Sequence, residues 1–195
     1  RVVAETETEI VGARDMCRAG ECQMGNLIAD AMLDRVKDQG IEIAIQNGGG
    51  IRASIDAGEV TMGEVLTVLP FQNTLSTFEV SGAAIVAALE NGVGQIEDGA
   101  GRFPQVAGMR YTFDVSQPAG SRISDVMVGD APIDPEKMYG VVSNNYVRNG
   151  GDGFAMFETA RNAYDFGPDL ADVTAEYMAA NAPYTPYLDG RITAR

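Results

Sequence analysis

The stretch Ile43-Ala44-Ile45-Gln46-Asn47-Gly48-Gly49-Gly50-Ile51-Arg52 carries the strongest local signal in this sequence. A short apolar run typical of a buried strand stops at Asn47, three glycines follow, and Arg52 comes shortly after them. Glycines lose much backbone entropy on folding, so a compact chain keeps them where φ is positive or where another group approaches the main chain. The stretch therefore predicts either a tight turn or a ligand-binding loop, and its residues alone leave both open.

The composition is that of an ordinary globular domain, with 195 residues, 45% hydrophobic and 22% charged. We expect one domain over residues 1–195. Its net charge of -14 argues against nucleic acid or an anionic membrane as partner, although a few gathered arginines could still bind a small anion. The segment Arg1–Thr6 resembles a strand rather than a signal peptide, and the missing initiator Met suggests an excised or processed fragment.

The chain contains no His. Its absence excludes Ser-His-Asp and Cys-His catalysis, a His general base and a His-rich metal site. A carboxylate-based enzyme such as a glycosidase would need two paired acids, but the 28 acidic residues are scattered. We therefore expect no catalytic residue and no metal site in this chain.

Two cysteines lie close together in Met16-Cys17-Arg18-Ala19-Gly20-Glu21-Cys22. Four residues separate them, one of which is Gly, so the chain can loop until the two Cβ atoms meet. A disulfide would hold Arg18 in a small ring and would indicate an oxidising compartment. Two reduced thiols are the alternative, and a metal site is disfavoured because no His or further Cys could complete it.

Hydrophobic periodicity and turn residues predict the remaining elements. Thr61 and Glu64 form a capping-box pattern, Ser81 can cap a helix, and Gly40 suits the position after a helix end. We expect helices at 24–36, 61–68, 83–90 and 170–180, strands at 2–11, 41–46, 74–80, 109–115, 123–128 and 138–143, and irregular segments at 53–60, 92–101 and 144–154. This order predicts a mixed α/β (α+β) fold, a single compact domain with a mixed sheet flanked by helices and not a doubly wound sheet.

The segment Ser143-Asn144-Asn145-Tyr146-Val147-Arg148-Asn149-Gly150-Gly151-Asp152-Gly153-Phe154 is a second polar, glycine-rich stretch. A carboxylate between glycines accepts hydrogen bonds with little steric hindrance, which suits a sugar diol. An Asx-type turn is the alternative. A calcium loop is disfavoured because the spaced acidic ligands and closing Glu of an EF-hand are missing.

Four motifs follow one another along the chain. They are Cys17-Arg18-Ala19-Gly20-Glu21-Cys22-Gln23-Met24-Gly25-Asn26-Leu27-Ile28-Ala29-Asp30-Ala31, Asn47-Gly48-Gly49-Gly50-Ile51-Arg52, Leu69-Pro70-Phe71 and Asn149-Gly150-Gly151-Asp152-Gly153-Phe154. Together they resemble one family, the C-terminal domain of the 5′-nucleotidases, a group that includes UDP-sugar hydrolases and 2′,3′-cyclic phosphodiesterases. The similarity runs from near residue 14 to the closing Leu188-Asp189-Gly190-Arg191-Ile192.

The resemblance implies a substrate-binding domain with specified roles. Phe71 and Tyr146 would sandwich a nucleobase, and Asp152 would hold the ribose hydroxyls. Asn47 would meet the base, Arg18 and Arg52 would face phosphate, and Gly49 and Gly50 would let the main chain approach the ligand. These residue types suit those tasks, since aromatic faces stack on bases and arginine forks pair with phosphate oxygens.

Two positions depart from the family pattern. Many relatives carry Phe where Tyr146 stands, so base preference could shift. Arg148 stands where we expect a small residue; it could contact phosphate, but we expect it to point to solvent.

The resemblance also implies a preceding metallophosphoesterase domain that holds two divalent metal ions in His, Asp and Asn motifs. A chain without His cannot contain that site, so we expect no turnover by this chain alone. The expected disulfide, which indicates an oxidising compartment, predicts an extracytoplasmic (periplasmic or secreted) location. The alternatives are a stand-alone nucleotide-binding module and the same domain in a UDP-sugar hydrolase or cyclic phosphodiesterase.

Overall fold

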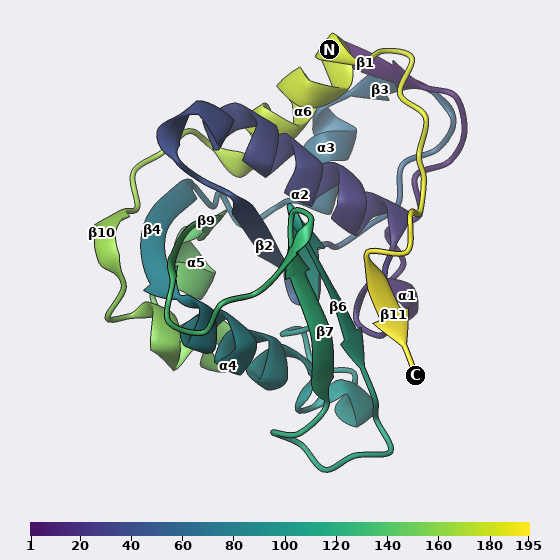
Figure 1. Ribbon diagram of the computed structural model, residues 1–195. Helices are drawn as coiled ribbons and strands as arrows, with labels where there is room; N and C mark the ends of the chain where they lie inside the picture. The colour runs from purple at the N-terminus through teal and green to yellow at the C-terminus, as the bar shows by residue number, and fades with distance from the viewer.

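The computed structural model describes all 195 residues and contains three sheets (Figure 1). The central sheet has the order β10 (Arg161–Tyr164), β4 (Leu75–Ser81), β9 (Met138–Asn144), β2 (Ile43–Asn47) and β5 (Pro104–Ala107). A second sheet has the order β11 (Ile192–Ala194), β6 (Met109–Phe113), β7 (Ile123–Val128) and β8 (Ala131–Pro132), and β1 (Val2–Thr6) pairs with β3 (Gly58–Thr61). Both larger sheets are mixed, because β2 runs parallel to β9 and β11 runs parallel to β6 while their other pairs are antiparallel.

Helices cover both faces of the central sheet (Figure 1). They are α1 (Arg14–Cys17), α2 (Gln23–Val36), α3 (Met62–Val68), α4 (Gly82–Val93), α5 (Asn145–Arg148) and α6 (Leu170–Ala180). One hydrophobic core lies under α2, α3 and α6 and the other under α4 and the second sheet. Alternate residues of β2 enter the two cores, Ala44 the first and Ile45 the second, as the two-residue period of a strand requires. The expected single α+β domain with a mixed sheet flanked by helices is confirmed.

Short-range capping starts the helices where the sequence predicts. Thr61 and Glu64 form both bonds of the capping box of α3, and Ser81 Oγ accepts from Ala84 N at 3.1 Å at the start of α4. Asp169 caps α6. Gly40 adopts the left-handed conformation, with φ of 74°, after one 3-10 turn has extended α2.

Several expectations were wrong in detail. The first strand ends at Thr6 rather than residue 11, and part of the expected linker 53–60 belongs to β3. The expected irregular segment 144–154 contains α5, which Asn144 caps by accepting from Val147 N at 2.9 Å. The sequence predicted none of α1, β5, β8, β10 or β11, because elements of two to four residues are too short to display a period. No helix combines the length and the apolar character that crossing a bilayer would require.

Candidate functional site

The candidate site lies where β2 and β9 end. The two strands are parallel neighbours, so their last residues, Asn47 and Asn144, reach the same edge of the sheet. Asn144 Nδ2 donates to Asn47 Oδ1 at 2.9 Å and to Gln46 Oε1 at 3.0 Å, and all three side chains are buried. This amide network joins the two glycine-rich loops that the sequence singled out.

The glycines after β2 allow close packing of main chains. Gly48–Gly50 form one 3-10 turn, in which Gly48 N donates to Phe103 O and Gly49 N to Gly101 O, each at 2.7 Å. A Cβ atom on Gly49 would lie 2.7 Å from the Cα atom of Gly101, and one on Gly48 would overlap the carbonyl oxygen of Cys17. At Gly48 and Gly49 a side chain is therefore excluded by neighbouring backbone, not by a positive φ.

A cleft of about 550 Å³ opens above this turn. It is lined by Arg18, Asn47, Gly49, Gly50, Arg52, Phe71, Asn73, Gly101, Tyr146 and Asp152. The structure thus brings together all eight binding residues expected from the sequence. It adds Asn73, two positions after Phe71, and Gly101, at the end of the segment expected to be irregular. The sequence indicated these two residues only through their position, Asn73 close to Phe71 and Gly101 in a glycine-rich segment.

Both aromatic rings of the cleft are unusually exposed. Phe71 and Tyr146 have 54% and 48% of their surface exposed. The Tyr146 ring lies directly against Gly151, where an added Cβ would come 2.5 Å from the ring atom Cζ. The Arg52 guanidinium carbon lies 5.6 Å from the centroid of Phe71. Each ring is therefore held in place while part of its surface remains open to a ligand.

Asp152 occupies a left-handed conformation, with φ of 55°, between glycines. Its Oδ2 accepts from Asn47 Nδ2 at 2.9 Å, its Oδ1 accepts from the Tyr146 hydroxyl at 3.0 Å, and its main-chain oxygen accepts from Asn91 Nδ2 at 3.0 Å. Burial and, next, the bond to Asp152 raise the pKa of Tyr146, so the phenol remains a donor at neutral pH. The carboxylate is oriented before any ligand arrives.

Two arginines provide positive charge in the cleft of a strongly acidic chain. Arg18 is nine-tenths buried, its Nη1 donates to Gly99 O at 3.1 Å, and its Nε has no partner. Burial lowers the pKa of Arg18, and the like charges of Arg14 and Arg52 lower it further. A group of cations that repel one another is suited to an anionic ligand, which would relieve the repulsion.

We expected Arg148 to point to solvent, and this was wrong, because its side chain is only 15% exposed. It does not line the cleft either. Its Nε and Nη2 donate to the carboxylate of Asp165 at 3.1 and 3.3 Å, and its Nη1 reaches the carbonyl oxygens of Phe157 and Glu158 at 3.2 Å. Asp165, which neutralises this arginine, lies outside the loop 143–154, so the sequence of the loop did not indicate this partner.

The predicted disulfide between Cys17 and Cys22 is present, with both residues buried and their Cα atoms 5.1 Å apart. No group of three or more His, Cys, Asp or Glu side chains is placed to hold a metal ion. The residues of this chain therefore do not fit a two-metal centre.

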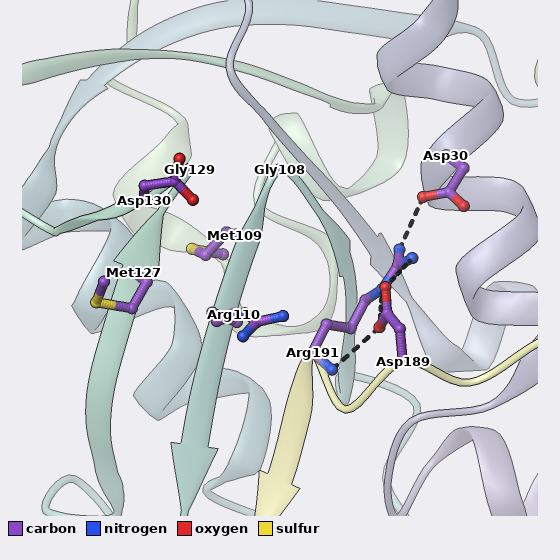
Figure 2. A pocket seen from close by; sticks show the side chains of 9 residues that line it. All are labelled: Asp30, Gly108, Met109, Arg110, Met127, Gly129, Asp130, Asp189 and Arg191. Atoms are coloured by element: carbon purple, nitrogen blue, oxygen red, sulfur yellow. Dashed lines mark hydrogen bonds and ion pairs between the residues drawn. The ribbon is translucent and has the colours of Figure 1, made fainter.

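A second hollow, of about 410 Å³, lies near the β6–β7 hairpin and the C-terminal segment (Figure 2). Its Arg191 is 7% exposed and donates to Asp30 Oδ1 at 2.8 Å, Asp189 Oδ1 at 2.9 Å and Val106 O at 2.9 Å. Burial opposes this charge, but the bonds to Asp189 and Asp30 outweigh it and raise the pKa of Arg191. These paired charges fasten the C-terminal segment to α2.

The chain is similar to known proteins both in sequence and in fold. The family model described as "5′-nucleotidase, C-terminal domain" matches residues 2–159. The chain is 42% identical to the trifunctional nucleotide phosphoesterase protein YfkN of Bacillus subtilis and 35% identical to a 5′-nucleotidase of Diplobatis ommata, over 97% and 98% of its length. Among solved structures, a 5′-nucleotidase precursor from Thermus thermophilus has a TM-score of 0.97 and 47% identity over the whole chain. The NAD nucleotidase of Haemophilus influenzae has a TM-score of 0.87 and 27% identity, also over the whole chain.

The chain spans only part of these proteins: 14% of YfkN, 36% of the Diplobatis enzyme and 39% of the Thermus chain. Within that part the agreement extends over the whole fold, and the family match includes both glycine-rich loops, Phe71 and the disulfide. The chain therefore belongs to the family of 5′-nucleotidase C-terminal domains.

Proposed function

We propose that this chain is the nucleotide-recognition domain of a 5′-nucleotidase-type phosphoester hydrolase, one that dephosphorylates nucleoside 5′-monophosphates or related nucleotides. The observation that carries the proposal is the lining of one cleft by two half-exposed aromatic rings, an oriented carboxylate and two arginines. A nucleotide has a flat base, a vicinal diol and a phosphate, and each finds a matching group in this cleft.

In this proposal Phe71 and Tyr146 stack on the nucleobase. Asp152 accepts hydrogen bonds from the ribose hydroxyls, and its existing bonds to Asn47 and Tyr146 support that role by fixing its orientation. Asn47 retains a second Nδ2 hydrogen with which it can meet the base. Arg18 and Arg52 receive the phosphate, and Gly49 and Gly50 leave room beside the main chain.

Hydrolysis itself is assigned to a partner domain. Phosphoester hydrolysis of this type needs a metal-activated water and a clamp on the leaving oxygen, and the side chains here fit neither requirement. We propose a preceding metallophosphoesterase domain with two divalent ions as that partner, so that this chain binds and orients the nucleotide. The disulfide supports an extracytoplasmic location, because oxidising compartments preserve such bonds.

A titration of the 195-residue chain with adenosine and with AMP, monitored by NMR, tests the proposal. AMP should bind weakly, because half of the partners of the phosphate would belong to the second domain. Adenosine, which has no phosphate, should bind through the base and ribose contacts alone. Phe71→Ala should weaken both ligands by about 1–3 kcal/mol through lost stacking, and Asp152→Ala should weaken both as well. Phe166→Ala is the matched control, since Phe166 is 81% exposed and lies outside the cleft. Binding that neither Phe71→Ala nor Asp152→Ala reduces would contradict the proposal.

UDP-glucose and 2′,3′-cyclic AMP, titrated in parallel, distinguish the related substrate classes. An assay of the chain with AMP and added manganese or zinc should show no turnover, and clear release of phosphate would refute the division of labour between two domains. The stand-alone binding module remains the second candidate. A coding sequence upstream of this chain with Asp-x-His and Gly-Asn-His motifs would exclude it.

A further inference from the structure

We propose that Gln105 is a positioning residue for phosphate recognition. It acts through the ring closed by the Cys17–Cys22 disulfide, which carries Arg18. The inference rests on the proposed function in one respect, namely that Arg18 meets the phosphate of a bound nucleotide. It adds a residue on another strand that sets where Arg18 stands, although Gln105 itself does not line the cleft.

The Gln105 side chain binds the disulfide ring at three points. It extends from β5, where its backbone pairs with Gln46 of β2, and it is fully buried. Its Nε2 donates to Cys17 O at 2.9 Å and to Gly20 O at 2.8 Å, while its Oε1 accepts from Cys22 N at 3.3 Å. One amide group thus satisfies main-chain groups at both ends and in the middle of the ring.

Only a primary amide of this length provides two donors and an acceptor at that place. A glutamate would present oxygens to two carbonyl groups, and a methionine would fill the space without hydrogen bonds. The position of the amide is further restricted by Gly25 of α2, where an added Cβ would overlap Gln105 Oε1. The side chain is therefore enclosed between the helix and the ring.

The outer side of the ring is held as well. Glu21 Oε2 accepts from Asn26 Nδ2 at 2.7 Å and from Asp189 N at 2.9 Å, and its Oε1 accepts from Gly190 N at 3.1 Å. The C-terminal segment, which supplies the Asp189 and Gly190 donors, is anchored to α2 by the Arg191–Asp30 ion pair drawn in Figure 2. The ring is thus clamped from inside by Gln105 and from outside by the C-terminal segment.

Arg18 needs this support because its own side chain is weakly tethered. Of its five N–H groups, one donates to a protein acceptor, the carbonyl of Gly99, and the buried Nε has no partner. The neighbouring charges of Arg14 and Arg52 repel it. Few hydrogen bonds therefore hold the guanidinium against a movement of the ring that carries it, and a shift of the ring would move the phosphate contact.

Gln105→Met tests the inference because it preserves side-chain length and volume but removes all three hydrogen bonds. Binding of AMP should weaken about tenfold, which is roughly 1.4 kcal/mol, while binding of adenosine, which has no phosphate, should not change. In an Arg18→Met background the same substitution should produce no further loss, since the group that it positions is already absent. A purely structural role of Gln105 would weaken both ligands alike.

Glu21→Ala provides a second, more exposed site for the same test, and urea unfolding verifies that each variant is folded. Glu21→Ala should also weaken the binding of AMP but not of adenosine. The loss should be smaller than in Gln105→Met, because the hydrogen bonds of Gln105 to the ring remain. If Gln105→Met does not fold, an equal loss of both ligands in Glu21→Ala, or no loss of either, overturns the inference. An equal loss of both ligands, or no loss of either, in a folded Gln105→Met variant also overturns the inference. The proposed function is not affected by that outcome. Wild-type protein that binds neither ligand refutes the proposed function itself.

Discussion

The hydroxyl of Tyr146 donates a hydrogen bond to Oδ1 of Asp152 at 3.0 Å. Asn47 donates to the other carboxylate oxygen of Asp152. Two of the roughly four acceptor positions of this carboxylate are therefore occupied, and about two remain for a diol. The aromatic ring and the carboxylate therefore form one unit within the cleft. A Phe at position 146 would keep the ring but leave the carboxylate with one side-chain donor fewer.

Tyr146→Phe should weaken adenosine binding by about 1 kcal/mol, because the Asp152 carboxylate would have to be ordered by the ligand. Binding of 2′,3′-dideoxyadenosine, which has no diol, should remain the same. Parallel titrations of the two nucleosides against both proteins measure the difference. An equal loss for both would mean that the hydroxyl affects stacking rather than the orientation of Asp152.

Gly49→Ala should destabilise the fold and impair the cleft. The new Cβ would lie 2.7 Å from Gly101 Cα and 3.0 Å from Gly101 O, both of which belong to backbone that cannot rotate away. We expect a loss of about 1–3 kcal/mol in urea unfolding. Gly63→Ala, in α3, is the control, because the new Cβ would meet only Thr61 Oγ1 at 3.8 Å. This substitution should leave stability unchanged or raise it, since Ala favours a helix over Gly. Equal stability of the two variants would refute the close approach of the main chains.

Arg148→Met should reduce stability without affecting nucleotide binding. The side chain is 15% exposed and paired with Asp165, which would lose its partner, at a cost of about 1–3 kcal/mol. Urea unfolding measures the first effect and AMP titration the second. Arg161→Met, at an exposed position of β10, should change neither. A selective loss of AMP affinity in Arg148→Met would restore the phosphate contact that the structure argues against.

The ion pair between Glu97 and Arg122 should make stability depend on pH below neutrality. Its Nη2–Oε2 distance is 2.6 Å, and hydrogen bonds from Arg122 lower the pKa of Glu97 from 4.5 to about 2. A depressed carboxyl pKa contributes stability that is fully present above the ordinary value and is lost as pH falls through the folded value. Wild type should exceed Glu97→Gln in urea midpoint at about pH 6, and the gap should close between about pH 4.5 and pH 2. A gap independent of pH would contradict this pairing.

The helix starts could be read from the sequence because each depends on hydrogen bonds over two or three residues. The caps at Thr61, Ser81 and Asp169 are of this kind. The disulfide also closes over a short separation, between Cys17 and Cys22. The cleft residues were expected from their resemblance to a family, while their residue types only indicated which contacts each could make.

The sequence by itself determined the mixed α+β character and the principal helices, and it indicated the cleft residues through their resemblance to a family. Only the tertiary structure decided that these side chains share one cleft, that Arg148 belongs to Asp165, and that Gln105 holds a ring more than eighty residues before it. The tertiary structure also determines that residues 192–194 form strand β11, because Ile192 pairs with Tyr111 of β6. The physical reason is that local hydrogen bonds depend on neighbouring residues, whereas these contacts exist only after distant segments have been packed against the same sheet.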